Sequence, residues 1–214
     1  MCVILFDLDG TLLDSTEAIL EGFEEAFKAH NSFLSKKEEV LDLIGHPLDV
    51  MFSRLGVEED IVESHVLAYK EHYRTISKIK TEFLPNAKEA IELAKSFATL
   101  GVVTTKTGRY SRELLEHMGV MDNFDVLIGR EDVINPKPHP EPILKAMQRL
   151  GANPEKTFMI GDTCMDMVAA SEASINGIGV TCGYGKRKDL IQCATFVTSD
   201  PLNAVKQIIK NVNY

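Results

Sequence analysis

The sequence Cys-Val-Ile-Leu-Phe-Asp-Leu-Asp-Gly-Thr-Leu-Leu-Asp occupies residues 2–14, and this stretch decides the fold class. Its first five residues, Cys2–Phe6, are all apolar, which is typical of a strand buried on both faces of a parallel sheet. The strand runs directly into Asp7 and Asp9, whose i and i+2 spacing places two carboxylates on one side of an extended chain. Gly10 then permits a sharp turn. Because ligands of open α/β sheets gather at the carboxyl ends of strands, the stretch predicts a polar site at the end of the first strand.

Further short apolar runs, separated by helical spacing, continue this pattern. The expected strands are Val102–Val103, Val126–Ile128, Thr157–Ile160 and Ile178–Val180, with Phe196–Val197 as an edge strand. Apolar residues at helical spacing predict helices around residues 87–94, 114–118, 143–150 and 202–209. We expect Gly101, Gly119 and Gly151 to follow such helices as left-handed C-caps. The alternation predicts an α/β protein with a Rossmann-like parallel sheet.

Residues 15–82 interrupt this alternation with helical patterns and no convincing strand. Amphipathic spacing occurs in four successive segments, at residues 18–27, 40–44, 50–55 and 61–69. We therefore expect residues 1–14 and 83–214 to form the α/β catalytic core and residues 15–82 to form an inserted, all-helical cap. An insert placed directly after the first strand can act as a specificity lid.

Composition and charge argue against a disordered chain and against nucleic-acid or membrane partners. Hydrophobic content of 44% and charged content of 26% are ordinary values for a globular chain and argue against disorder. The 23 Lys and Arg residues against 32 Asp and Glu residues give 23 − 32 = −9. A surface of that sign repels nucleic acid and acidic membranes, so neither partner is expected.

The N-terminus and the cysteines favour a cytoplasmic protein. Residues 1–6 are too short an apolar stretch for a signal peptide before the charge of Asp7, and no apolar run is long enough to span a membrane. The four cysteines show neither Cys-x-x-Cys nor Cys/His ligand spacing, and a chain of this length does not need disulfides. We expect four free thiols. Acidic neighbours of Cys164 argue against a reactive thiolate there.

Four motifs in order give the chain a family resemblance. They are Asp7-Leu8-Asp9-Gly10-Thr11, Val103-Thr104-Thr105-Lys106, Asn135-Pro136-Lys137-Pro138-His139-Pro140-Glu141-Pro142 and Gly161-Asp162-Thr163-Cys164-Met165-Asp166. With them, nearly the whole chain resembles the haloacid dehalogenase superfamily, and within it the phosphoglycolate phosphatase-like group. That group carries a helical cap between its first and second motifs, where residues 15–82 lie. The resemblance implies the α/β core and the cap.

The resemblance also implies roles for these residues. Asp7 is expected to be the nucleophile that accepts a phosphoryl group, which divides a difficult hydrolysis into two displacements. Asp9 is expected to protonate the leaving alkoxide and then to activate water. The expected phosphate-binding residues are Thr104, Thr105 and Lys137. An acid at position 9 favours phosphate esters, since the dehalogenases and phosphonate hydrolases of the superfamily lack it.

The expected cofactor is Mg²⁺, which prefers oxygen ligands in an octahedral arrangement. By resemblance, the protein ligands are Asp7, the backbone carbonyl of Asp9, and Asp162. Asp166 is expected to act through water or by orienting Lys137.

The leading functional hypothesis is a Mg²⁺-dependent phosphatase of small soluble phosphomonoesters, nominally phosphoglycolate. Phosphosugar, nucleotide and inorganic pyrophosphate hydrolysis remain alternatives, as does a phosphomutase of the beta-phosphoglucomutase type. From another class, a non-catalytic phosphoacceptor similar to receiver domains would also use strand-end Asp, Thr and Lys, but receivers lack a helical insert after the first strand. His46 and Arg54 are the specificity candidates in the cap. The chain is expected to work as a monomer or homodimer.

Overall fold

The computed structural model describes residues 2–32 and 36–212. The chain divides into two compact units, one made of Met1–Asp14 and Phe83–Tyr214 and the other of Ser15–Glu82. A two-stranded sheet of β2 (Leu13–Asp14) and β3 (Glu82–Phe83) lies at the two points where the chain passes between the units.

The first unit is built on a six-stranded sheet. Its strands are β1 (Cys2–Phe6), β4 (Ala98–Val103), β5 (Val126–Ile128), β6 (Thr157–Gly161), β7 (Asn176–Val180) and β8 (Phe196–Thr198). They are ordered β5-β4-β1-β6-β7-β8 and every pairing is parallel. The predicted parallel α/β fold is confirmed, and each expected strand is present.

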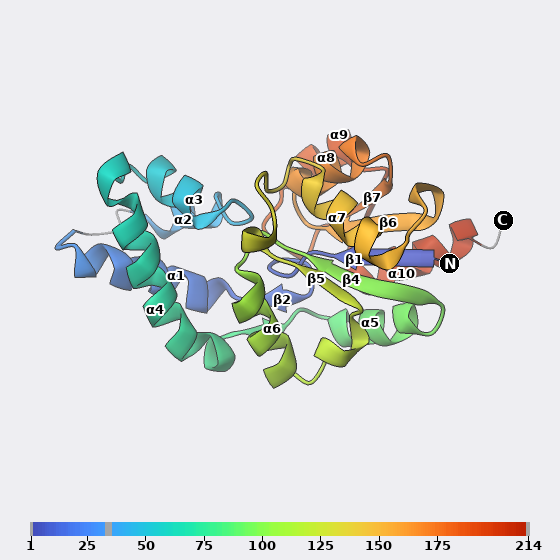
Figure 1. The fold of residues 1–214 in the computed structure, drawn as a ribbon, viewed down its shortest axis with the longest axis horizontal. Coiled ribbons are helices and arrows are strands. Elements are labelled where there is room, and N and C mark those ends of the chain that lie inside the picture. The colour runs from blue at the N-terminus through green and yellow to red at the C-terminus, as the bar shows by residue number, and fades with distance from the viewer. Residues whose placement is uncertain (1, 33–35, 213–214) are drawn as a thin grey trace. The chain divides into compact units, whose positions relative to one another are not determined.

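Helices cover both faces of this sheet (Figure 1). They are α5 (Ala87–Lys95), α6 (Gly108–His117), α7 (Glu141–Leu150), α8 (Cys164–Glu172), α9 (Arg187–Cys193) and α10 (Pro201–Val212), with the short 3-10 turns η2 (Met121–Asn123), η3 (Arg130–Asp132) and η4 (Pro154–Lys156). The side chains of successive residues in β1 lie on opposite faces of the sheet. Ile4 and Phe6 pack in one apolar cluster with α5 and α10, whereas Val3 and Leu5 pack in another with α7 and α8. All four are fully buried, which explains the continuous apolar run.

The strand order places the topological switch point of the sheet at β1. From β1 the chain proceeds to β4 and β5 on one side, and then crosses to β6, β7 and β8 on the other. In open α/β sheets the crevice at the carboxyl ends of strands beside such a switch point is where ligands bind. The residues that follow β1, β4 and β6 therefore meet at the position the fold reserves for a site.

Two expectations about this unit are wrong. Gly101 does not cap a helix, because α5 ends at Lys95 and Gly101 lies inside β4. A side chain there would collide with Val126 and Leu5, so close strand packing explains this glycine. Gly119 and Gly151 do take the expected left-handed conformation after α6 and α7.

The cysteines are not all free thiols either. Cys164 and Cys193 form a disulfide with a Cα–Cα distance of 5.9 Å, while Cys2 and Cys182 are free. The pairing arises because Cys164 begins α8 and Cys193 ends α9, and these two helices pack together. Burial raises the pKa of the Cys182 thiol to about 11, so it stays protonated at neutral pH.

The second unit is helical. It contains α1 (Thr16–Ala29), α2 (Lys37–Leu41), α3 (Leu48–Arg54), the 3-10 turn η1 (Glu59–Ile61) and α4 (Val62–Lys80). Its core is aromatic, with Phe23 contacting Phe52 and Tyr69 at ring-centroid distances of 4.6 and 5.0 Å. Gly22 of α1 leaves room for the Tyr69 ring, which lets α1 and α4 pack closely.

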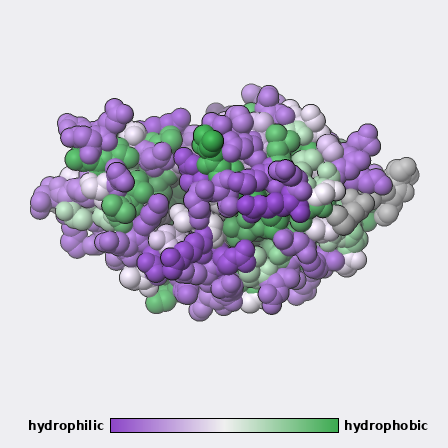
Figure 2. Space-filling view, viewed as in Figure 1, coloured by the Kyte–Doolittle hydropathy of each residue, from purple (hydrophilic) through white to green (hydrophobic). Residues whose placement is uncertain are grey.

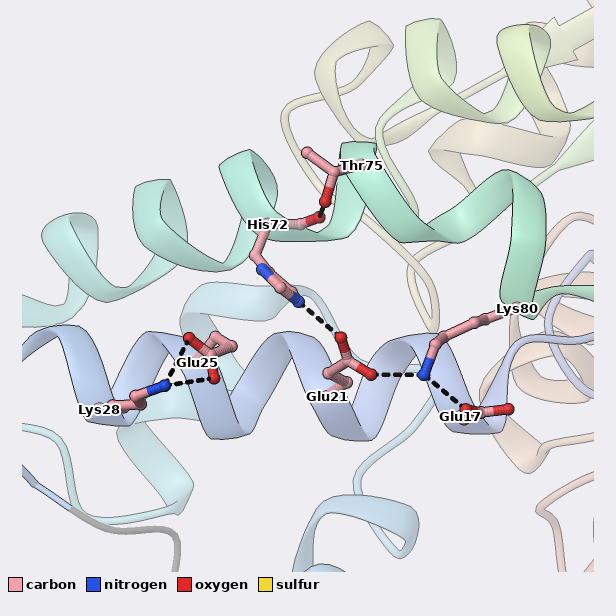
Figure 3. Close-up of polar contacts among 7 residues, drawn as sticks. All are labelled: Glu17, Glu21, Glu25, Lys28, His72, Thr75 and Lys80. Atoms are coloured by element: carbon pink, nitrogen blue, oxygen red, sulfur yellow. Dashed lines mark hydrogen bonds and ion pairs between the residues drawn. The ribbon is translucent and has the colours of Figure 1, made fainter.

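Polar contacts join α1 to α4 along the edge of that core (Figure 3). Lys80 donates to Glu17 at 2.5 Å and to Glu21 at 2.6 Å, and the His72 ring contacts Glu21 at 2.8 Å. These contacts tie the end of α4 to the start of α1, so the two ends of the helical unit are held together.

One face of the molecule is predominantly polar (Figure 2). On the face in Figure 2, hydrophilic residues cover most of the area and hydrophobic residues form separate patches. Within residues 2–32 and 36–212, none of the helices is long and apolar enough to cross a membrane.

Candidate active site

The residues singled out from the four motifs converge at the carboxyl ends of three adjacent strands. Asp7 and Asp9 follow β1, Thr104 follows β4, and Asp162 follows β6. Lys137 comes from the loop before α7, and Asp166 from the first turn of α8. All of these residues belong to the α/β unit.

Three carboxylates form the centre of the site. Asp7, Asp162 and Asp166 each offer an oxygen, and these oxygens lie within 4.8 Å of one another. Asp7 is 4% exposed and the other two are fully buried. Burying ionised carboxylates is costly unless cations or hydrogen-bond donors compensate them, so their surroundings decide what they can do.

Lys137 is the cation that compensates them within the protein. Its ammonium donates to Asp166 Oδ1 at 2.5 Å, to the Val103 carbonyl at 3.0 Å, and approaches Asp7 Oδ1 at 3.0 Å. With a side-chain exposure of 2%, it has little access to water. The lysine therefore bridges the strand-end acid of β1 and the helix acid of α8.

Hydrogen bonds orient the two acids of the last motif. The Thr11 hydroxyl donates to Asp162 Oδ1 at 3.3 Å, and the Tyr184 amide donates to Asp162 Oδ2 at 2.8 Å. The backbone amide and hydroxyl of Thr163 both donate to Asp166 Oδ2, at 3.1 and 2.7 Å. Asp166 thus serves at once as an N-terminal acid of α8 and as a partner of Lys137.

Sequence reasoning missed the loop that supplies the Tyr184 amide. This loop follows β7, and its glycines Gly183 and Gly185 pack directly on Asp162. A side chain at Gly183 would also collide with the Gly10 carbonyl. The Gly-Tyr-Gly sequence at residues 183–185 was the available signal, since paired glycines often mark a close backbone approach.

Replacing Gly185 by Ala should loosen this loop. A Cβ there would overlap the backbone oxygen of Asp162, so either the loop or Asp162 must move. We expect the free energy of unfolding to fall by about 1–3 kcal/mol, measured by urea denaturation. Gly179→Ala is the control, because its Cβ would meet only side chains, at 3.1 Å or more. Unchanged stability in Gly185→Ala would show that the loop does not depend on this contact.

Burial shifts the protonation of the acids. Burial raises the pKa of Asp7 to about 7, opposed by Lys137 and reinforced by Asp166. Burial also raises the pKa of Asp162 well above its usual value, with Asp166 and Asp7 adding to the effect. For Lys137, burial alone would lower the pKa, but Asp166 and Asp7 outweigh it and raise the pKa. The acids therefore lack full compensation from the protein alone.

The chemistry of this donor set fits a divalent cation. When all three carboxylates are ionised, they and the one ammonium sum to −3 + 1 = −2, concentrated in a buried volume. Carboxylate oxygens are the ligands that Mg²⁺ and similar hard cations take. Asp7, Asp162 and Asp166 are the residues that could hold such an ion. The sequence interpretation had given Asp166 an indirect part, whereas the structure brings one of its oxygens into the same group.

Asp9, two residues after Asp7, pairs with Lys106 of the second motif. Lys106 donates from its ammonium to Asp9 Oδ1 at 2.8 Å. Thr104 is buried, and its hydroxyl oxygen accepts from the Lys106 amide at 3.1 Å, which leaves the hydroxyl hydrogen to donate elsewhere. Thr105 follows it in the same loop and is partly exposed.

The cap candidates His46 and Arg54 contact each other. His46 Nε2 lies 2.9 Å from Arg54 Nη1, and burial followed by the charge of Arg54 lowers the pKa of His46. Arg54 also lines an open pocket of about 600 Å³. That pocket also includes the acids Asp49, Glu59 and Glu63, so negative charge predominates around Arg54 there.

Comparison with known proteins gives the family. The family model for haloacid dehalogenase-like hydrolases matches residues 4–180, which include the acids, lysines and threonines of the site but not the Tyr184 loop. The chain belongs to the haloacid dehalogenase-like hydrolases. Its three buried aspartates are consistent with the divalent metal site of this family.

Relatives extend along almost the whole chain. Pyrophosphatase PpaX of Oceanobacillus iheyensis is 37% identical over 208 residues, covering 96% of this chain and 94% of that protein. Phosphoglycolate phosphatase of Salmonella typhi is 33% identical over 205 residues, covering 85% of this chain and 81% of that protein. A haloacid dehalogenase-like hydrolase of Streptococcus pneumoniae superposes with a TM-score of 0.87 at 27% identity, covering 97% of this chain and 98% of that one. The predicted phosphatase class is confirmed.

Proposed function

We propose that this phosphatase is Mg²⁺-dependent and hydrolyses small soluble phosphate compounds through an aspartyl-phosphate on Asp7. The observation that carries the proposal is the position of the Asp7 carboxylate, buried among Asp162, Asp166 and Lys137 at the switch point of the sheet. Phosphoryl transfer needs a positioned nucleophile and positive charge around the transferred group, and these residues provide both.

Each residue then has a part in the chemistry. Asp7 attacks phosphorus and the bond to the leaving oxygen breaks, after which water releases phosphate from Asp7. Asp9 donates a proton to the leaving oxygen and later accepts one from that water. Lys137 and the Thr104 hydroxyl donate to the phosphoryl oxygens. Bound Mg²⁺, held by Asp7, Asp162 and Asp166 with the Asp9 carbonyl, would supply further positive charge to those oxygens.

The substrate we favour is phosphoglycolate, with inorganic pyrophosphate as the second candidate. A relative named phosphoglycolate phosphatase supports the first, and a relative named pyrophosphatase, which matches more of the chain, supports the second. Both are small anions, which agrees with a site that contains two lysines, Lys106 and Lys137. A phosphomutase would instead return the phosphoryl group to a sugar, and its turnover would depend on a sugar bisphosphate.

Phosphate release from a panel of substrates tests the proposal. The panel includes phosphoglycolate, pyrophosphate, sugar phosphates and nucleotides, each with and without Mg²⁺. We expect kcat/KM of at least ~10⁴ M⁻¹s⁻¹ for one of the first two and none in EDTA. Activity that survives EDTA, or that requires a sugar bisphosphate, would contradict the proposal.

We further propose that the helical unit Ser15–Glu82 sets substrate preference, with His46 and Arg54 contributing. The direct contact between their side chains means that removing either one changes the other. His46→Ala and Arg54→Ala should therefore alter the ranking of substrates in the same direction. Rankings identical to the wild type in both variants would show that these two residues do not determine specificity.

Mg²⁺ should stabilise the protein more at high pH than at low pH. The pKa of Asp7 is raised from 3.8 to about 7, and that of Asp162 is raised as well. For a group with a raised pKa, folding is favoured while it is protonated, and this stability is lost as pH rises from about 4 through about 7. A cation needs the deprotonated acids, so it competes with protons.

The measurement is thermal unfolding with and without saturating Mg²⁺. We expect a gain in Tm of about 5 °C or more at pH 8 and under about 2 °C at pH 5.5. Asp122→Asn, which alters an exposed acid, should reproduce the wild-type gains. Equal gains at the two pH values would contradict ion binding by these acids.

A further inference from the structure

Lys106 places a second, fixed positive charge in the active site. Its backbone is anchored on both sides, because its amide donates to Thr104 Oγ1 at 3.1 Å and its carbonyl accepts from the Arg130 amide at 3.0 Å. Its ammonium reaches Asp9 Oδ1 at 2.8 Å, and its side chain is only 11% exposed. The lysine is thus held in position before any substrate arrives.

The two lysines of the site face different acids. Lys137 contacts Asp7 and Asp166, and is therefore directed at the nucleophile and the metal-binding group. Lys106 contacts Asp9, the residue proposed above to protonate the leaving oxygen. The nearby Arg109, in contrast, pairs with Glu113 on the exposed side of α6. Lys106 is therefore the cation placed on the side of the leaving group.

We propose that Lys106 determines specificity by selecting substrates whose leaving group carries a negative charge close to the bridging oxygen. This inference rests on the proposed function, in particular on Asp9 as the proton donor to that oxygen. A general acid lies within about 2.6–3.2 Å of the oxygen that it protonates. An ammonium 2.8 Å from Asp9 Oδ1 is therefore close enough to reach an anionic group two or three bonds from the bridging oxygen.

Both favoured substrates have such a group. In pyrophosphate the leaving phosphate places anionic oxygens two bonds from the bridging oxygen. In phosphoglycolate the carboxylate oxygens lie three bonds away. A charge-assisted hydrogen bond to either anion would change affinity by about 10- to 100-fold. One lysine would thus favour both of the substrates for which these relatives are named.

Substitution of Lys106 tests this selection by charge. Steady-state kinetics of wild type, Lys106→Met and Lys106→Arg would be compared on pyrophosphate, phosphoglycolate and 2-hydroxyethyl phosphate. The third substrate matches phosphoglycolate in length but has an uncharged leaving group. In Lys106→Met we expect the ratio of kcat/KM for phosphoglycolate to that for 2-hydroxyethyl phosphate to fall at least 10-fold, mainly through KM. Lys106→Arg should restore part of the ratio.

Other outcomes distinguish failure of the Lys106 proposal from failure of the proposed function. A wild-type ratio near one, or equal losses on all three substrates in Lys106→Met, would overturn the proposal and leave Lys106 as a positioning residue for Asp9. The wild-type ratio needs no variant, so it decides the matter even if Lys106→Met does not fold. If the wild type turned over none of the three substrates, the proposed function itself would fail.

Discussion

Asp7→Asn is expected to lower phosphate release by about 10⁴-fold or more while the protein remains folded. An amide cannot accept the phosphoryl group, so no acyl phosphate can form and the remaining residues have nothing to act on. The fold should survive because Asp7 raises the electrostatic cost of the site: its carboxylate lies among buried acids, and its pKa is already raised to about 7. We expect Tm without Mg²⁺ to stay within about 3 °C of the wild type.

Activity and thermal unfolding of the same preparation are the measurements. Asp122→Asn is the matched control, since it makes the same chemical change at an exposed acid outside the site. Residual activity in Asp7→Asn above a few per cent of the wild type would show that another group is the nucleophile. Loss of the folded state would instead show that Asp7 is needed for structure.

Lys137→Met should lose both activity and stability. The lysine is 3% exposed, and its removal leaves Asp7 and Asp166 buried without their cation. Breaking a buried ion pair from one side costs about 3–5 kcal/mol in the free energy of unfolding. Urea denaturation without Mg²⁺ should show this loss, and saturating Mg²⁺ should recover part of it by compensating the same acids.

Lys95→Met provides the comparison for that loss. Lys95 pairs with Asp125 at 3.0 Å, but the two side chains are 38% and 45% exposed. An exposed pair of this kind contributes at most about 1 kcal/mol. If Lys137→Met and Lys95→Met lost equal stability, the buried lysine would not have the compensating role that its contacts indicate.

Much of the fold was predictable because its signals are local. The apolar run Cys2–Phe6 reports burial on both faces, and the structure shows β1 over the same residues. Asp7, Asp162 and Lys137 stand at strand ends or in the loop beside them, so motif order in the sequence could indicate that they meet. The helical character of residues 15–82 also follows from periodicity alone.

Features that depend on tertiary packing were not predictable. The Cys164–Cys193 disulfide exists because α8 and α9 pack together, and a spacing of 29 residues does not by itself predict it. Gly101 stands in the sequence between the predicted helix and the apolar pair Val102–Val103, so its place inside β4 depends on how far the strand extends. The contact of Lys106 with Asp9 joins residues 97 apart in the sequence, and only the parallel pairing of β1 with β4 brings them together.

Trapping the covalent intermediate tests the central claim most directly. Enzyme mixed with substrate and Mg²⁺ would be quenched within one turnover and treated with borohydride, which converts an aspartyl-phosphate to homoserine, and the digest would be sequenced by mass spectrometry. Homoserine is expected at position 7 in the wild type and at no position in Asp7→Asn. Homoserine at another aspartate, or none in the wild type while phosphate is being released, would contradict Asp7 as the nucleophile.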